Sequence, residues 1–431
     1  MSGFRTLPDG PLRLTNLTVP ACLIGAPGDL APIDLSIADG RIVEAGGAEV
    51  DMAGAMVFPA FVDMHTHLDK GHIWGRAPNP DGTFAGALTT VRADTEAHWS
   101  ADDVYRRADF SLRCAYAHGT RAVRTHIDSR PPQDEISWPV FQDLRADWAD
   151  RIDLQGVCLV GVDTMDPAGA FVRTADLVAE AGGVLGMVTY PVPDLHDKLR
   201  AFLRLAAERG LAADFHVDET MDPSSETLRA IAEAVLEMGF DAPVVVGHCC
   251  SLSTQDEGRA METLDLVARA GLNVVSLPMC NLFLQDRQAG RTPRGRGITL
   301  VHEMAARGIP VSFASDNTRD PFYAYGDMDM LEVMREATRI GHLDHAGPDW
   351  SRAFLTTPAR ACGFAAPSLT PGAPADLVLV RARSWTELFA RPQADRIVLR
   401  GGRAIDTTLP DYAELDDLME KTAAPMRKPA E

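Results

Sequence analysis

The chain has 431 residues, of which 46% are hydrophobic and 24% are charged, and its formal net charge is -20 at pH 7. This length allows one elaborated domain, or a large domain with a smaller one, and either can bury a sizeable core. No run of Lys and Arg stands out against the acidic balance. Nucleic acids and anionic membranes both require a basic footprint, so we expect neither as a partner.

The start of the chain and its cysteines bear on the compartment. The first residues show no charged-then-apolar signal pattern, and nowhere do roughly eighteen apolar residues follow one another. The seven cysteines are odd in number and irregularly spaced, which favours reduced thiols over a disulfide framework. We therefore expect a cytoplasmic protein.

Short strands separated by turns are predicted at both ends of the chain. Near the N-terminus they cover residues 12–19, 21–24, 33–37 and 40–43, and near the C-terminus residues 375–380 and 396–403. Asp39-Gly40 between two apolar runs is a strong hairpin signal. Two β-rich ends that flank a different middle predict one small domain assembled from residues 1–56 and 368–431.

The middle of the chain, residues 57–367, alternates strand and helix eight times. The predicted strands are 57–63, 122–127, 154–160, 184–189, 212–217, 244–246, 272–277 and 311–314. The predicted helices are 100–117, 140–148, 167–180, 195–208, 225–238, 256–270, 299–307 and 327–340. Near-continuous apolar strands between helices indicate an α/β fold with a parallel sheet, and eight such units predict a (β/α)8 TIM-type barrel. A doubly wound open sheet is the alternative, but no glycine fingerprint follows the first strand.

Polar residues recur where these predicted strands end. His65 and His67 end the first strand and point to the same side of it, because side chains alternate along a strand. The fifth, sixth and eighth strands end in His216 with Glu219, in His248 and in Asp316. The chemistry of a barrel sits at these carboxyl ends. Histidines on predicted helices or the surface are assigned no role: His98, His118, His196, His302, His342 and His345.

These residue types together predict a metal-dependent hydrolase. His65, His67, His216 and Asp316 make a nitrogen-rich site for one divalent metal, and the set suits Zn²⁺ and Fe²⁺ equally. Such a metal lowers the pKa of its water to about 7. Glu219 is predicted to move the proton, and His248 to hydrogen-bond the attacking oxygen.

The motifs that carry these residues resemble the amidohydrolase superfamily, and the cytosine deaminase branch most closely. The matching stretches are HTHLD, VRTHID, HVDE, VGH, NLFLQDR, RGITL and SDNTRDPF, with GAPADLVLV and VLRGGRAI near the C-terminus. The resemblance implies a mononuclear metal site, a barrel with a small β-sandwich built from both termini, and hydrolytic deamination of an aminated heterocycle. Two-metal relatives carry a lysine at the end of strand four, where this chain reads VTYPVP.

The chain differs from the cytosine deaminase branch at positions that contact the substrate ring in that branch. Gly161 stands at the position of a glutamine that contacts the pyrimidine, Asn317 at that of an aspartate, and Phe322 at that of a tryptophan that covers the ring. The loss of the glutamine amide changes which edge of the ring can find hydrogen-bond partners, and glycine should enlarge the pocket. A larger ring such as a pterin, or another cyclic amidine, is therefore a candidate substrate beside a cytosine-like pyrimidine. Further candidate substrate contacts are Lys70, Trp74, Asn281 and Gln285.

The sequence therefore predicts an enzyme that releases ammonia from an amino-substituted nitrogen heterocycle, either a cytosine-like pyrimidine, a pterin or a related cyclic amidine. Two alternatives stay open. The same mononuclear site could cleave a cyclic amide or an N-alkyl substituent, or the barrel could be a catalytically silent assembly module. The sequence leaves the oligomeric state open, although proteins of this kind often form homo-oligomers.

Overall fold

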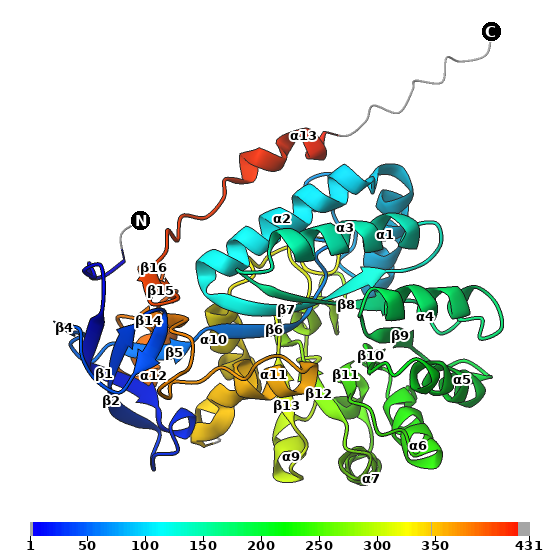
Figure 1. Cartoon of the computed structure of the whole chain (residues 1–431). Coiled ribbons are helices and arrows are strands. Elements are labelled where there is room, and N and C mark those ends of the chain that lie inside the picture. The colour runs from blue at the N-terminus through cyan, green and yellow to red at the C-terminus, as the bar shows by residue number, and fades with distance from the viewer. Residues whose placement is uncertain (1–2, 346, 421–431) are drawn as a thin grey trace.

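Eight parallel strands and the helices between them form the centre of the computed structural model, which describes residues 3–345 and 347–420 (Figure 1). One three-stranded parallel sheet holds β6 (Phe61–Thr66), β7 (Thr120–Asp128) and β8 (Asp153–Leu159). A five-stranded parallel sheet holds β9 (Leu185–Thr189), β10 (Ala213–Val217), β11 (Val244–His248), β12 (Asn273–Ser276) and β13 (Val311–Phe313). The predicted α/β class is confirmed.

Isolated bridges join the two parallel sheets at both of their edges. Val157 pairs with Val184 and Gly161 with Val188 between the β8 and β9 sides, and Thr66 pairs with Asp316 beyond β13. The eight strands therefore follow one another around a circuit, and all their carboxyl ends lie on the same side of it. This arrangement brings residues that follow different strands to one place.

Seven of the eight predicted helices agree with the structure within three residues at each end, whereas α3 (Asp134–Asp147) begins six residues before the predicted 140–148 and contains Pro139. The other seven are α2 (Ala101–His118), α4 (Ala170–Glu180), α5 (Leu195–Glu208), α6 (Thr227–Met238), α7 (Glu257–Arg269), α9 (Val301–Ala306) and α10 (Met330–Gly341), followed by α11 (Thr356–Cys362). Ser100 caps α2 by accepting from the amide of Asp103, and Gly119 ends it in the left-handed conformation. The sequence did not predict the remaining α-helices of the described residues, which are α1 (Phe84–His98), α8 (Pro278–Leu284), α11, α12 (Trp385–Ala390) and α13 (Asp416–Met419).

The predicted strand 57–63 is wrong, because two strands share this apolar run. β5 (Met56–Pro59) pairs antiparallel with β14 (Leu377–Val380), whereas β6 begins at Phe61 and pairs with β7. Every residue of both strands is buried, so the apolar run continues across the break, and Pro59 at the end of β5 is the local sign of it. The first ring strand is thus shorter and starts four residues later.

Strands from the two ends of the chain pair in a second, mixed sheet of the order β16-β15-β14-β5-β1-β2-β3. The other members are β1 (Leu12–Pro20), β2 (Leu30–Ala38), β3 (Arg41–Val43), β4 (Ala48–Asp51), β15 (Ile397–Arg400) and β16 (Arg403–Ala404). The Asp39-Gly40 hairpin between β2 and β3 is confirmed, with φ of 49° and 77°. The predicted strand 21–24 is wrong: Ala21–Leu23 forms a 3-10 helix.

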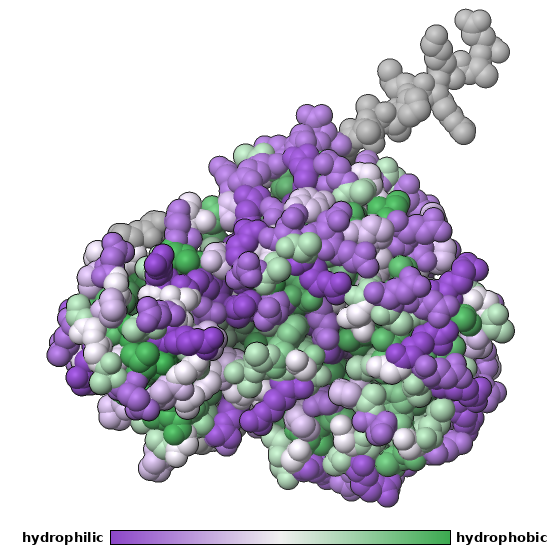
Figure 2. All heavy atoms as spheres, in the orientation of Figure 1, coloured by the Kyte–Doolittle hydropathy of each residue, from purple (hydrophilic) through white to green (hydrophobic). Residues whose placement is uncertain are grey.

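The C-terminal segment leaves this sheet and lies against α2 (Figure 1). Its last described helices are a 3-10 turn (Tyr412–Leu415) and α13 (Asp416–Met419), and Asp417 pairs with Arg106 of α2 at 2.7 Å. Residues 421–431 of the predicted terminal domain lie outside the described residues. Hydrophilic residues gather over α13 and the neighbouring part of α2 in Figure 2. Within the described part of the chain, no helix combines the length and the apolar character needed to cross a membrane.

Candidate active site

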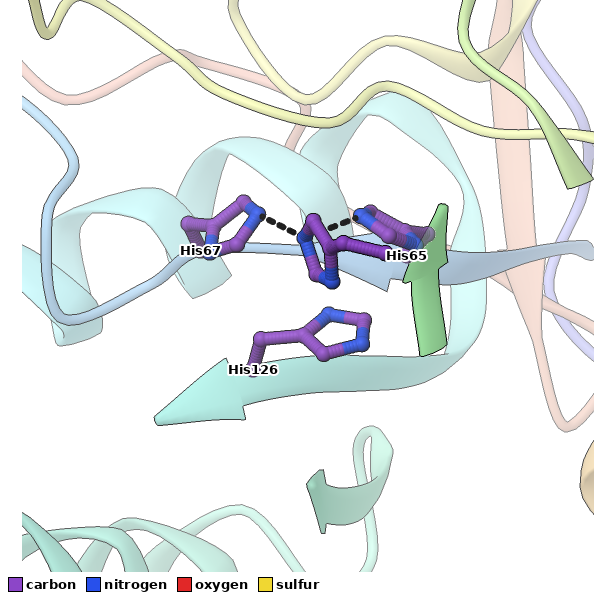
Figure 3. A group of neighbouring side chains, drawn as sticks. His65, His67 and His126 are labelled. Carbon is purple, nitrogen blue, oxygen red and sulfur yellow. Dashed lines mark hydrogen bonds between the residues drawn. The ribbon is translucent and has the colours of Figure 1, made fainter. Parts of the chain in front are cut away.

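Four of the predicted site residues converge at the carboxyl ends of their strands. Nε2 of His216 lies 3.1 Å from Nε2 of His65 and 3.2 Å from Nε2 of His67. Oδ1 of Asp316 lies 3.6 Å from Nε2 of His65 and 3.4 Å from Nε2 of His67. All four residues are buried, and Figure 3 shows the histidine rings gathered around one point. These four side chains, which lie far apart in the sequence, thus meet around a common point.

The spacing of these atoms suits a divalent metal. Ligands about 2.0–2.1 Å from a tetrahedral Zn²⁺ lie about 3.3 Å apart, close to the separations found here. The pKa values of His65, His67 and His216 lie well below the ordinary value because of burial and the neighbouring histidines and cations, so the three rings are neutral, as ligands must be.

Asp316 gives a second sign that a cation belongs here. Neither of its buried carboxylate oxygens accepts a hydrogen bond of good geometry from the described residues. Burial, together with the nearby carboxyl groups of Asp320 and Asp63, raises the pKa of Asp316 to about 8. A buried, uncompensated anion is costly, and a metal ion would remove that cost.

A fourth histidine, His126 of β7, packs against this cluster (Figure 3). Its ring centroid lies 4.1 Å from that of His65 and 4.5 Å from that of His216. Nε2 of His126 lies 3.2 Å from Oδ1 of the buried Asp214, whose other oxygen accepts from Arg124 at 2.8 Å. The VRTHID stretch put Arg124 and His126 on the second predicted strand at the barrel mouth, and it left a structural and a functional role for His126 equally open. Its pairing with Asp214 makes it a support for the ligand rings.

Glu219 and His248 lie beside the metal-ligand cluster. Oε1 of Glu219 is 3.5 Å from Nδ1 of His248, and the Glu219 side chain is only 11% exposed. Burial and the charge of Asp316 raise the pKa of Glu219 well above its ordinary value, although Lys70 opposes this. Burial, with His126 nearby, lowers the pKa of His248 to about 3, so its ring is neutral. The surroundings of Glu219 thus favour the neutral, proton-carrying form of its carboxyl group.

The amide of Asn281 orients the His248 ring. Nδ2 of Asn281 lies 2.9 Å from Nδ1 of His248 and donates to it, which puts the ring proton on Nε2. That Nε2 has no partner among the described residues. Asn281 was predicted to contact substrate, and the structure instead gives it this place behind His248.

A cavity of about 1060 Å³ opens in front of these groups. The predicted site residues that line it are His67, Lys70, Gly161, His216, Glu219, His248, Gln285, Asp316, Asn317 and Phe322. Trp74 and Asn281 are not among the lining residues. The unpredicted helix α1 supplies an apolar wall through Phe84, Leu88 and Val91. The cavity is at the upper end of the volumes found for small-molecule sites, roughly 300–1,000 Å³.

The space beside Gly161 is taken by two other residues. A Cβ atom at this position would lie 2.7 Å from Oδ1 of Asp163 and 3.1 Å from Oη of Tyr190, and these two side chains hydrogen-bond each other. The expected gain in volume at Gly161 is therefore offset by Asp163 and Tyr190, which both line the cavity. No motif in the sequence pointed to this pair.

Comparison with known proteins gives a consistent picture. The Amidohydrolase family model matches residues 48–137 and 163–406. The chain is 53% identical over 420 residues to a pterin deaminase of Rhizobium rhizogenes, covering 94% of this chain and 96% of that protein. The 5-methylcytosine deaminase of Klebsiella pneumoniae with bound 5-fluorocytosine has a TM-score of 0.75 at 25% identity, covering 93% of this chain and 98% of that one. The N-isopropylammelide isopropylaminohydrolase of Burkholderia multivorans has a TM-score of 0.70 at 25% identity, with coverages of 92% and 98%.

Proposed function

The chain belongs to the amidohydrolase family, and we propose that its substrate is a pterin, from which it removes the exocyclic amino group. It is a metal-dependent hydrolase of carbon–nitrogen bonds and a hydrolytic deaminase of nitrogen heterocycles. The observation that carries the choice of a pterin is the 53% identity with a pterin deaminase over 94% of the chain. The cavity of about 1060 Å³ supports it, because a bicyclic ring needs more room than a pyrimidine.

His65, His67, His216 and Asp316 are the proposed ligands of one zinc or ferrous ion. When bound, a metal of this kind acts as a Lewis acid and lowers the pKa of water to about 7. The support for this assignment is the close approach of the three Nε2 atoms and the uncompensated carboxylate of Asp316.

Glu219 is the proposed proton carrier. It takes a proton from the attacking water and delivers it to the ring nitrogen beside the carbon that bears the amino group. The water oxygen bonds to that carbon, and Glu219 then moves the second water proton from this oxygen to the exocyclic amino group. The carbon–nitrogen bond breaks, ammonia leaves and a carbonyl remains. Its raised pKa supports this role, since the carboxyl group can hold the proton between the two steps. His248, held by Asn281, donates from Nε2 to the oxygen that develops charge.

We also propose that the circuit of eight strands is a (β/α)8 barrel over residues 57–367. Residues 1–56 and 368–431 would then form the β-sandwich domain. The bridges that link both edges of the parallel sheets support the first assignment, and the pairing of β5 with β14 supports the second.

Measured ammonia release tests the function. Purified enzyme loaded with zinc or iron is assayed against pterin, cytosine, isocytosine and guanine. We expect kcat/KM for pterin to exceed that for cytosine by about 100-fold or more, because a pocket built for one ring edge strongly rejects another. Efficient turnover of cytosine with no release from pterin would contradict the assignment.

The variant Glu219→Gln tests the proton carrier. It should lose at least about 10³-fold in kcat, because the amide cannot shuttle the proton, while its metal content stays at the wild-type level. Metal analysis of the same preparation is the control. Retained activity would remove Glu219 from this role.

Hydrolysis of an N-alkyl substituent is the second candidate. The likeness to an N-isopropylammelide isopropylaminohydrolase favours it, since that protein shares the fold at 25% identity. Product analysis separates the two, because this reaction releases an alkylamine in place of ammonia. A silent assembly module is set aside, because the chain is an enzyme of its family.

A further inference from the structure

A buried ion pair lines the cavity beside the metal-ligand cluster. Nζ of Lys70 lies 2.9 Å from Oδ1 of Asp128, and the two side chains are 7% and 24% exposed. Burial opposes the charge on Lys70, but Asp128 and Asp69 outweigh it and raise the pKa of the ammonium group. Both residues line the cavity, together with His67 and Asp316. A permanent positive charge therefore faces the substrate space.

This ammonium group has hydrogen-bonding capacity to spare. An ammonium carries three donors, and among the described residues only Asp128 accepts from Lys70. Oδ2 of Asp128 likewise has no hydrogen-bond donor in the described part of the chain. The two side-chain amides at the inner end of the cavity are engaged, because Nδ2 of Asn317 donates to Asp320 at 2.7 Å and Nε2 of Gln285 donates to the carbonyl of Glu219 at 3.1 Å.

Phe322 places an aromatic face next to the same pair. Nζ of Lys70 lies 5.9 Å from the centroid of the Phe322 ring, and Phe322 packs edge-on against Phe84 of α1 at 5.4 Å. Phe322 and Phe84 thus give the cavity an aromatic wall beside Lys70 and Asp128, against which a flat heterocycle can pack. In a pose that turns the edge of the heterocycle toward the pair, its in-plane donors and acceptors come within reach of Lys70 and Asp128.

We propose that Lys70 and Asp128 together read a lactam edge of the substrate ring, a carbonyl beside a ring N–H. Lys70 donates to the carbonyl oxygen, and Asp128 accepts from the adjacent N–H. The inference rests on the proposed function, since a pterin carries such an edge next to the carbon that bears its amino group. Nζ of Lys70 lies 2.9 Å from Oδ1 of Asp128, so the N–H donors of Lys70 and the Oδ2 of Asp128 that have no partner among the described residues lie side by side as the complement of that edge. An amide side chain would offer the same pattern, and Gly161, where the related cytosine deaminases carry glutamine, has none to offer.

The test compares two substrates that differ only in this edge. One is pterin, and the other is the aminopteridine that lacks the ring carbonyl and hence the lactam N–H. In Lys70→Met, kcat/KM for pterin should fall by about 10- to 100-fold more than kcat/KM for the second substrate, the loss expected for a hydrogen bond to a charged group. Lys70 also lowers the pKa of Glu219, so both substrates can slow together, and the ratio isolates the carbonyl contact.

Two further variants keep the outcome decisive. Asp128→Asn should lower the ratio of kcat/KM for pterin to kcat/KM for the aminopteridine. The amide group is a poorer hydrogen-bond acceptor than the carboxylate, and it binds the ammonium group of Lys70 more weakly. Lys198→Met is the matched control: Lys198 donates to the carbonyl of Val162 at 2.8 Å but does not line the cavity, so the ratio should stay at the wild-type value.

The results separate a failure of the proposed function from a failure of the role assigned to Lys70 and Asp128. If the wild-type enzyme releases ammonia from neither ring, the proposed function is wrong and the lactam assignment with it. If the wild-type enzyme deaminates pterin but Lys70→Met and Asp128→Asn leave the substrate ratio unchanged, the assignment alone is wrong, and the pair only stabilises the fold.

Discussion

The carboxylate of Asp218 offers the sharpest test of how the site is held. Asp218 lies between His216 and Glu219, directly after β10, and its φ is 47°. Its Oδ1 accepts from Oγ of Ser225 at 2.6 Å, and from the amide and hydroxyl of Thr227 at 3.0 and 2.8 Å. Its Oδ2 accepts from the amide of Leu228 at 2.9 Å. One buried side chain therefore ties the turn that carries Glu219 to the N-terminus of α6.

The variant Asp218→Asn removes part of this anchor without changing its size. If the amide oxygen keeps the three donors at Oδ1, the amide NH2 replaces Oδ2 and faces the Leu228 N–H, so one charge-assisted bond is lost. That loss should lower the free energy of unfolding by about 2 kcal/mol. For a chain of this size such a change lowers Tm by about 2 °C. A displacement of Glu219 by about 1 Å should lower kcat by about 100-fold, with KM changed far less.

The assay combines thermal unfolding with steady-state ammonia release at a temperature where both proteins are folded. The control is Asp256→Asn, the same change at the N-cap of α7, where Asp256 accepts from the amide of Arg259 at 3.1 Å. It should lower Tm slightly and leave kcat unchanged. An Asp218→Asn enzyme with reduced Tm but wild-type kcat would refute the reasoning, because the carboxylate would then stabilise the fold without positioning Glu219.

Two further predictions follow from close contacts elsewhere. Gly247→Ala should lower metal affinity by about 10-fold or more in chelator competition, because its Cβ would lie 3.1 Å from Cε1 of His65, while Gly258→Ala in α7 should not. Burial opposes ionisation of Asp329, but Arg396 at 2.6 Å lowers its pKa below the ordinary 3.8. Because the pKa of Asp329 is lower in the folded than in the unfolded protein, its carboxylate stabilises the fold above the unfolded-state pKa, and this contribution is lost as the pH falls. Asp329→Asn should therefore have a lower Tm than the wild type at pH 7, and its Tm should fall less steeply with decreasing pH below roughly pH 4. An unchanged metal affinity, or an unchanged acid limb, would contradict the respective prediction.

The metal-ligand candidates could be found from the sequence because the fold brings them to the carboxyl ends of its parallel strands. Histidines and carboxylates at the ends of parallel strands must share one side of the sheet, and His65, His67, His216 and Asp316 all follow apolar runs that are easy to recognise. Pairing partners could not be found in this way. Pro59 marks where the first strand ends, but nothing in residues 56–66 tells which strand pairs with β14 and which with β7, since both are wholly buried.

The apolar wall that helix α1 supplies to the cavity was harder to predict than the metal-ligand candidates, for a physical reason. Helix α1 buries only Ala87, Val91 and Asp94, and much of its remaining apolar surface faces the cavity rather than the core. A helix of that kind lacks the apolar stripe by which amphipathic helices are recognised. Trp74 failed as a candidate for the converse reason: proximity in sequence to the metal histidines says little about the direction in which a loop turns.

The backbone at the strand ends shows why position in sequence was nevertheless informative. Asp218, His248 and Asp316 adopt φ values of 47°, 67° and 65°, although side chains make this left-handed region unfavourable. Conformations of this kind cost about 1–3 kcal/mol each and persist where surrounding contacts over-determine them. At Asp218 those contacts are its four hydrogen bonds, and at His248 the bond from Asn281. The backbone turns sharply after β10, β11 and β13, which brings the following side chains back over the carboxyl ends of the strands. An extended backbone at these points would place the same side chains away from the site. The strain is therefore a condition for convergence, and a contact that maintains it matters to catalysis even when it touches no substrate.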